Sequence, residues 1–176
     1  IYRVNAGQID KNSWIQDKEV GGGRIIGEVC HFIDYLTYIN GSPPNRVSAE
    51  VVPDIHGLND SVNILLKFKN GSIGSICYHS IGSNNLPKEY IEINTSGKSI
   101  ILNDFRELRV YEKGRIDKTK LINQNKGQKE MVKLFFNSLL KGNQSIIDFN
   151  DIISVTKTTF SILKSIQNNG CQIKIK

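Results

Sequence analysis

The chain has 176 residues, which is enough for one domain with a sizeable hydrophobic core. Hydrophobic residues make up 39% of it, but no stretch reaches the roughly 18 apolar residues of a membrane span, so we expect none. The net charge of +6 would suit an anionic partner. No aromatic residue lies among the basic positions from 115 to 129, where a nucleic-acid surface would need stacking rings, so we expect no nucleic-acid binding.

The cysteines and the first residues of the chain indicate the redox compartment of the protein and its relation to a longer chain. Cys30, Cys77 and Cys171 are odd in number and far apart, so we expect free thiols in a reducing, cytoplasmic compartment. Cys77 and His79 share one face of a predicted strand and could join Cys30 and His31 around zinc. The sequence lacks a close Cys pair, however, and we expect no metal. The chain opens without an apolar signal segment and in strand-like sequence, which suggests a piece of a longer protein.

The first half of the chain predicts one long helix and four strands. The strands are expected over residues 2–6, 46–52, 61–69 and 72–79. The helix follows three glycines at 21–23 and should end at Asn40-Gly41, because Asn-Gly stops helices and two prolines follow. Asn70-Gly71 lies between the last two strands and predicts a hairpin, because both residues tolerate positive φ.

The second half predicts further strands and then two helices. The strands are expected over residues 89–94, 99–102 and 107–111, with a weak one over 116–122 and a short final one over 172–176. One helix covers 128–140 and places on one side Met131, Leu134, Phe135 and Leu139. The other begins at an N-cap, Asp148, and its expected buried stripe is Ile152, Val155, Thr159, Leu163 and Ile166.

Together these elements predict an α+β fold. We expect one domain over residues 1–176, with a mostly antiparallel open sheet of about six or seven strands and helices packed on one face. The opposite face of such a sheet must be solvated or form an interface.

The helix after the three glycines gathers ionisable groups on one face. At about 100° per residue, Arg24, Glu28, His31 and Tyr35 form one stripe with Asp34 beside it, and apolar residues lie opposite. A histidine takes and returns protons near neutral pH, and Glu28 and Asp34 each lie three residues from His31, where they could orient its ring. These neighbours favour a chemical role for His31, on a face with Arg24 and Glu28 at a pocket. The alternative is a histidine that is structural or simply exposed.

The pattern G-G-G-x₇-H-x-x-D, which ends at His31 and Asp34, resembles the C-terminal domain of the Gfo/Idh/MocA oxidoreductases. These are relatives of glucose–fructose oxidoreductase and inositol dehydrogenase, and the domain is similar to the C-terminal domain of dihydrodipicolinate reductase. With Asn5-Ala6-Gly7 and Trp14-Ile15-Gln16-Asp17, the chain resembles a narrower branch of fused dehydrogenases linked to surface-polysaccharide sugars. The resemblance covers nearly the whole chain.

The resemblance implies a two-domain enzyme. An N-terminal Rossmann domain, which these 176 residues do not contain, would bind NAD or NADP, and the enzyme would oxidise or reduce a sugar, nucleotide-sugar or cyclitol hydroxyl. The chain alone would then be inactive. His31 matches the acid/base histidine of the family. The family usually has Asp four residues earlier, where this chain has Gly27, and we expect the adjacent Glu28 to replace it.

The resemblance also guides the remaining expectations about the site. The candidate substrate-binding residues are Arg3, Asn5, Trp14, Arg24 and Asp34, and we expect Arg3, Asn5 and Trp14 to line the same pocket as His31. Self-association through the open sheet face is implied as well, which would make the protein a homo-oligomer. The alternative function is a non-catalytic carbohydrate-binding module, or a scaffold, on the same fold.

Overall fold

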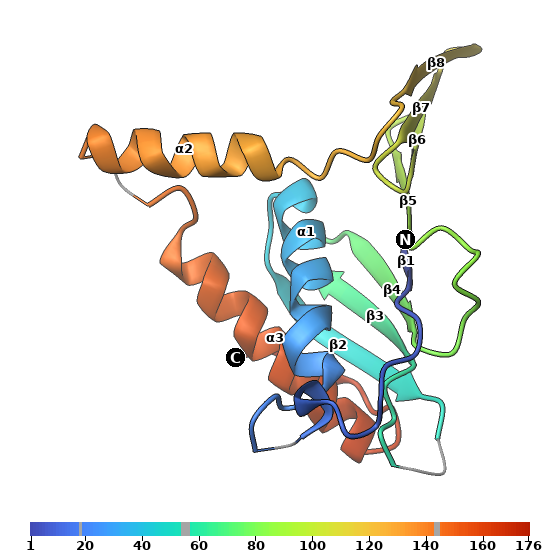
Figure 1. Ribbon diagram of the computed structural model, residues 1–176, viewed down its shortest axis with the longest axis vertical. Coiled ribbons are helices and arrows are strands. Elements are labelled where there is room, and N and C mark those ends of the chain that lie inside the picture. The colour runs from blue at the N-terminus through green and yellow to red at the C-terminus, as the bar shows by residue number, and fades with distance from the viewer. Residues whose placement is uncertain (18, 54–56, 143–144) are drawn as a thin grey trace.

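The computed structural model describes residues 1–17, 19–53, 57–142 and 145–176, and these residues form one nine-stranded sheet with helices on one side (Figure 1). The strands are β1 (Tyr2–Asn5), β2 (Pro44–Val51), β3 (Val62–Phe68), β4 (Ile73–His79), β5 (Glu89–Thr95), β6 (Lys98–Asn103), β7 (Glu107–Glu112), β8 (Arg115–Lys120) and β9 (Ile173–Lys174). The helical segments are η1 (Trp14–Gln16), η2 (Ile25–Val29), α1 (Cys30–Asn40), α2 (Gln128–Leu140) and α3 (Phe149–Gln167).

The sheet has the order β8-β7-β6-β5-β1-β4-β3-β2-β9. Strand β1 lies in its middle, parallel to β4 and antiparallel to β5, and the other described pairings are antiparallel. The predicted α+β fold with a mostly antiparallel open sheet is therefore confirmed. The sheet has nine strands, more than the six or seven expected, because β8 and β9 pair at its two edges. All six residues of β8 are exposed, so β8 lacks the apolar alternation that identifies a half-buried strand.

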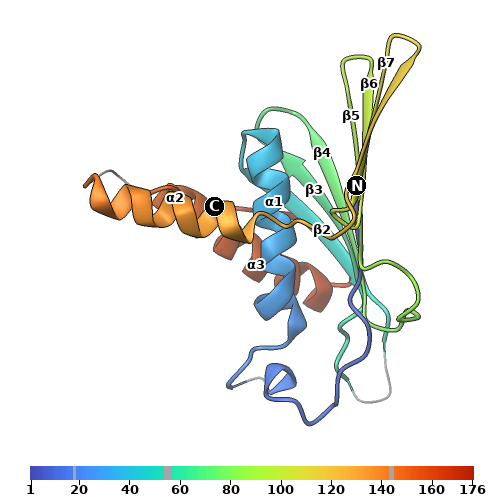
Figure 2. The same ribbon diagram turned by 45° about the horizontal axis from the view of Figure 1, so that its top comes forward.

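Two helices, α1 and α3, cover one face of the sheet, as Figure 2 shows with the sheet almost edge on. The core lies between these layers. Strand β3 illustrates it, because Val62, Ile64, Leu66 and Phe68 are buried while Leu65 between them is half exposed. This alternation is typical of an antiparallel sheet with one covered face. No helix among the described residues is long and apolar enough to cross a membrane.

Two predicted turns are confirmed. Helix α1 ends at Gly41, whose φ of 62° is left-handed and whose N–H donates to the carbonyls of Thr37 and Tyr38. The hairpin between β3 and β4 turns at Asn70-Gly71, where Gly71 has a φ of 93°. Both positions need backbone conformations that glycine adopts without strain.

The two C-terminal helices have the expected bounds but pack differently from the prediction. The Asp148 cap of α3 is confirmed, because its carboxylate accepts the Asn150 N–H at 2.7 Å. The buried residues of α3 are Val155, Thr158, Thr159, Ile162 and Ser165, whereas Ile152 is 48% exposed and Leu163 and Ile166 are only partly buried. The apolar pattern misses this face because three of its residues are polar; Ser165, for example, accepts the Ala49 N–H and donates to the Cys171 carbonyl. Helix α2 has no buried residue.

Candidate functional site

The chain enters α1 through a tight glycine turn and one π-helical turn, η2. Gly22 and Gly23 have left-handed φ values of 69° and 84°. A Cβ on Gly21 would lie 2.4 Å from the carbonyl oxygen of Trp14, so only glycine fits there. Gly21 therefore packs the turn against the backbone of η1. A π turn at this point is notable because such turns are frequent at functional sites.

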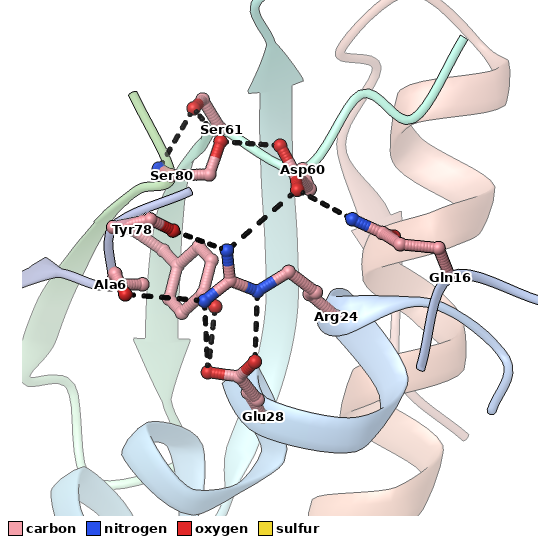
Figure 3. A network of polar contacts seen from close by, with 9 residues as sticks. Ala6, Gln16, Arg24, Glu28, Asp60, Ser61, Tyr78 and Ser80 are labelled. Carbon is pink, nitrogen blue, oxygen red and sulfur yellow. Dashed lines mark hydrogen bonds and ion pairs between the residues drawn. The ribbon is translucent and has the colours of Figure 1, made fainter. Parts of the chain in front are cut away.

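Arg24, just before η2, is the centre of a buried polar network (Figure 3). Its Nε donates to Glu28 at 2.8 Å, and its Nη1 donates to the Gly7 carbonyl at 2.7 Å. The guanidinium lies over the Tyr78 ring, 5.2 Å from the centroid, and 3.9 Å from a carboxylate oxygen of Asp60. Arg24 thus joins the end of β1, the start of α1, β4 and the segment before β3. Its side chain is 2% exposed, so it fixes these elements together.

Glu28 belongs to the same network. It accepts hydrogen bonds from Arg24 and, at 2.8 Å, from the hydroxyl of Tyr78. Burial opposes its ionisation, but the hydrogen bonds from Arg24 and Tyr78 outweigh burial and lower the pKa of the carboxyl. Burial and the bond to Glu28 both raise the pKa of Tyr78, so the phenol stays protonated and donates. Both carboxylate oxygens of Glu28 are therefore already bound by residues other than His31.

His31 is exposed on α1, less than one turn after Glu28. Its acidic neighbour in electrostatic terms is Asp34. Burial and then the charge of Asp151 raise the pKa of the Asp34 carboxyl, while attraction to His31 acts in the opposite direction. The structure thus couples His31 to Asp34 and couples Glu28 to Arg24.

A polar hollow of about 410 Å³ lies at the end of β1. Its lining residues are Asn5, Asn84, Asn85, Leu86, Pro87, Lys88, Asp104, Gln124 and Lys126. Asn5 shapes it, because its amide donates to the carbonyls of Ser83 and Leu86 and holds their loop in place. Lys88 helps to lower the pKa of Glu28, so the hollow and the Arg24 network interact electrostatically. Amides, an acid and two lysines offer both donors and acceptors to a ligand.

A second buried network lies beside the hollow. Glu89 is 5% exposed and accepts hydrogen bonds from the hydroxyl of Tyr2 and the ammonium of Lys126. The ring of Tyr35, from the α1 stripe, packs edge-on against Tyr2 and Phe105 with centroids 5.3 and 6.1 Å apart. Tyr35, one turn after His31, therefore packs against residues that adjoin the hollow but do not line it.

Sequence reasoning missed Glu89, Lys126, Tyr78 and Asp60. The only sequence signal for Glu89 is its place in a predicted strand, two residues before the buried Ile91. The partners of these residues come from distant parts of the chain, and no local spacing predicts such pairs.

The other predicted site residues are spread over the molecule. Trp14 lies on η1 and is 67% exposed. Arg3 points away from α1, because its neighbours Tyr2 and Val4 are buried against the helices and side chains alternate along a strand. On that open face its guanidinium lies over Tyr90, 5.9 Å from the ring centroid. The structure therefore does not bring Arg3 to the same pocket as His31.

The zinc alternative does not fit the geometry. Cys77 lies on the open face of β4, between the buried Ile76 and Tyr78, whereas Cys30 and His31 belong to α1 on the opposite face. Among the described residues, no group of three His, Cys, Asp or Glu side chains is close enough to hold a metal ion.

Solved structures with the same fold include several oxidoreductases. Levoglucosan dehydrogenase, in complex with NADH and levoglucosan, aligns with a TM-score of 0.79 and 20% identity over 99% of this chain and 58% of that one. An aldose–aldose oxidoreductase from Caulobacter crescentus aligns with a TM-score of 0.78 and 16% identity, over 98% of this chain and 54% of that one. A candidate myo-inositol dehydrogenase from Sinorhizobium meliloti aligns with a TM-score of 0.75 and 16% identity, over 99% of this chain and 56% of that one. The chain thus spans a little over half the length of these proteins, and at such identities the likeness shows the fold.

Sequence comparison assigns the family. A comparison with curated proteins gives no match. The family model of the GFO/IDH/MocA C-terminal domain matches residues 2–100, which include β1, the glycine turn, α1 and the strands through β5. The chain therefore belongs to the Gfo/Idh/MocA C-terminal domain family.

Proposed function

We propose that this chain is the substrate-binding domain of an NAD- or NADP-dependent oxidoreductase that acts on a hydroxyl group of a sugar, nucleotide sugar or cyclitol. The observation that carries the proposal is the exposed His31 on the α1 stripe. It lies between Glu28, whose pKa Lys88 of the hollow helps to lower, and Tyr35, whose ring packs against Phe105. The fold neighbours named for levoglucosan, aldose and myo-inositol chemistry support a polyhydroxylated substrate. We place the enzyme in the cytoplasm, in the synthesis of surface-polysaccharide sugars.

His31 would act as the acid/base. When the substrate hydroxyl is oxidised, its O–H proton passes to a ring nitrogen of His31, and in the reverse direction His31 returns it. A nicotinamide cofactor supplies the hydride acceptor or donor when it is bound. Asp34 lies on the same helix, three residues after His31, and interacts with it electrostatically. The amides of the hollow would hold the other hydroxyl groups of the substrate.

The cofactor would be held by a second, Rossmann-type domain. Within this chain, backbone atoms of Trp14 and Ile15 fill the space beside Gly21, the first residue of the glycine run. The fold neighbours extend well beyond the part that this chain matches, which leaves room for such a domain. The substrate would then lie between the two domains, with the chain alone inactive.

Glu28 keeps a place in the proposal as a supporting carboxylate. The family Asp is replaced by Gly27, and Glu28 would act through Arg24 and Tyr78, whose positions it fixes at the end of β1 and on β4. Arg24 and Asn5, both buried, would hold the surrounding segments in place. Trp14 is exposed on η1 and would contact the substrate with its exposed ring.

We also propose that the protein forms a homo-oligomer through the open face of the sheet. Leu65 on β3 is 50% exposed and Ile73 on β4 is 72% exposed. They lie on the same face as Ser75 and Cys77, and Leu65 pairs with Ser75 across the strands. Large apolar side chains in such a position are typical of interfaces. A monomer at high concentration in small-angle scattering would contradict this proposal.

A non-catalytic carbohydrate-binding module on the same fold is the second candidate. It is favoured by the replacement of the family Asp by Gly27 and by the engagement of both Glu28 oxygens away from His31. Calorimetric titration of the 176-residue chain with sugars and with NADH shows whether the chain binds the substrate, the cofactor or both. Sugar binding without NADH binding supports a substrate domain, while NADH binding would overturn the assignment of the cofactor to another domain.

Turnover by the full-length protein tests His31 itself. We expect His31→Ala to lower kcat by roughly 10²- to 10⁴-fold, the usual contribution of a positioned acid/base. His79→Ala is the matched control, because His79 ends β4 on the open face. Equal turnover in the two variants would remove His31 from the mechanism and favour the binding module.

A further inference from the structure

Helix α2 carries an apolar face that no described part of the chain covers. Its members are Met131, Val132, Leu134, Phe135, Phe136, Leu139 and Leu140, and their exposed fractions run from 46% for Val132 to 85% for Leu140. We call them the α2 apolar face. Figures 1 and 2 both show α2 extending away from the sheet, beyond the helices that cover it. The apolar surface continues after α2 with Ile146, Ile147 and Phe149, which are at least half exposed.

A helix of this length needs a partner. Isolated helices shorter than about 12–15 residues are marginal in water, and most helical stability in proteins comes from packing of an apolar face. Helix α2 has 13 residues and no buried one. The polar residues Glu130, Lys133 and Asn137 occupy only a narrow opposite side, so the apolar face is broader than that of a solvent-exposed helix.

The start of α2 lies close to the start of the chain. Tyr2 and Lys126 both donate to the carboxylate of Glu89, so the residue that precedes the Gly127 cap of α2 and the second residue of the chain share one partner. A domain joined ahead of Ile1 would therefore begin next to the base of α2. Fold neighbours have the length for such a domain, because this chain covers only 53–59% of them.

We propose that the α2 apolar face docks onto the nucleotide-binding domain that precedes Ile1 in the full-length protein; this inference rests on the proposed function. A second copy of the chain fits less well. Lys129, Lys133 and Lys141 outnumber the single acid Glu130 on and just after α2, so two copies of this helix would bring like charges together.

Docking would also act on the substrate hollow. Gln124 and Lys126 line the hollow, and the chain runs from them directly into α2. Lys126 is held by Glu89 at one end of this segment, and a docked α2 would hold the other end. Gln124 also donates to the Asp104 carbonyl and the Asn125 N–H to the Phe105 carbonyl, so docking would add a further support to a wall that is already held.

Hydrogen–deuterium exchange tests the contact. We expect the amides of α2 to exchange roughly 100-fold more slowly in the full-length protein than in the 176-residue chain, because docking suppresses local opening. Phe135→Lys should abolish the difference, whereas Asn137→Lys, on the polar side, should preserve it. In the 176-residue chain, Phe135→Lys should leave the unfolding midpoint unchanged, since that ring is 53% exposed.

Other outcomes would overturn the docking. Equal exchange in the two proteins would show that the preceding domain does not cover α2. Protection that rises with protein concentration would identify a second copy as the occupant. Titrations of the full-length protein with NADH and with NADPH separate this inference from the proposed function. Binding of either dinucleotide with an unprotected α2 overturns only the docking, and a protected α2 that binds neither overturns the nucleotide-binding nature of the occupant.

Discussion

The two halves of the sheet differ in how they are stabilised. Strands β1 to β4 lie under α1 and α3 and contain fully buried side chains such as Leu66 and Tyr78. In the outer wing, β6, β7 and β8, no residue is buried. The wing instead carries cross-strand ion pairs, among them Lys98–Glu112 at 3.0 Å and Lys118–Glu107 at 3.3 Å.

The two halves differ in how strongly solvent screens their polar interactions, because helices cover only one of them. Under α1, the side chain of Arg24 is 2% exposed and that of Glu28 is 25% exposed, so solvent screens this ion pair less than a pair on the surface. In the wing, solvent screens the ion pairs, and such pairs contribute little to stability. The polar hollow lies at the border between these halves, where rigid elements and solvent access meet. Candidate catalytic groups are best placed at such a border.

Removing core volume should give the largest contrast between the halves. Leu66 has 0% exposure under the helices, so Leu66→Ala should lower the free energy of unfolding by about 4 kcal/mol, the sum of lost burial and a cavity. Leu108→Ala in the wing, where the side chain is 37% exposed, should cost about 1 kcal/mol or less. Urea denaturation of both variants measures this. Equal losses would mean that the wing is as well packed as the covered half.

Breaking the buried network should have the next largest effect. Arg24→Met keeps most of the side-chain volume but leaves Glu28 without its cation, and we expect a loss of about 3 kcal/mol in the free energy of unfolding. Adding Glu28→Gln should recover part of that loss, because no uncompensated charge then remains. Lys98→Met, which breaks an exposed wing pair, is the control and should cost about 1 kcal/mol at most. A double variant no more stable than Arg24→Met would show that the charge pair is not the cause.

The pH dependence of stability should separate the two acids of the α1 stripe, with the smallest effect. The folded pKa of Glu28 is lowered, so its contribution is present above the unfolded pKa, near 4.5, and is lost as pH falls through the folded pKa. The folded pKa of Asp34 is raised, so ionisation destabilises the fold as pH rises above about 3.8. Glu28→Gln should therefore reduce the stability that the protein loses on acidification and lower its stability at neutral pH, whereas Asp34→Asn should raise stability at neutral pH. Thermal melts across pH 3–7 measure both effects. If the two substitutions changed stability at neutral pH in the same direction, this assignment would be wrong.

Local signals in the sequence predict most elements and their ends. Gly41, Asn70-Gly71 and Asp148 mark a helix end, a hairpin and a helix start, because each acts through the backbone of its immediate neighbours. The family was also accessible, since the motif around His31 is local. Alternation in β3 predicted which of its side chains are buried, because strand periodicity is a local property as well.

Which side chains meet, by contrast, depends on how distant segments fold together. Arg24 could be placed beside Glu28 from helical spacing, but Tyr78, Asp60 and the Gly7 carbonyl come from other segments. The same holds for Glu89, which joins Tyr2 to Lys126 across more than 120 residues of sequence. Helix α2 has an amphipathic pattern that predicts packing but does not identify a partner, and the described residues leave its apolar face uncovered. Local spacing fixes an element and its faces, whereas the contacts of those faces depend on segments far away in the chain.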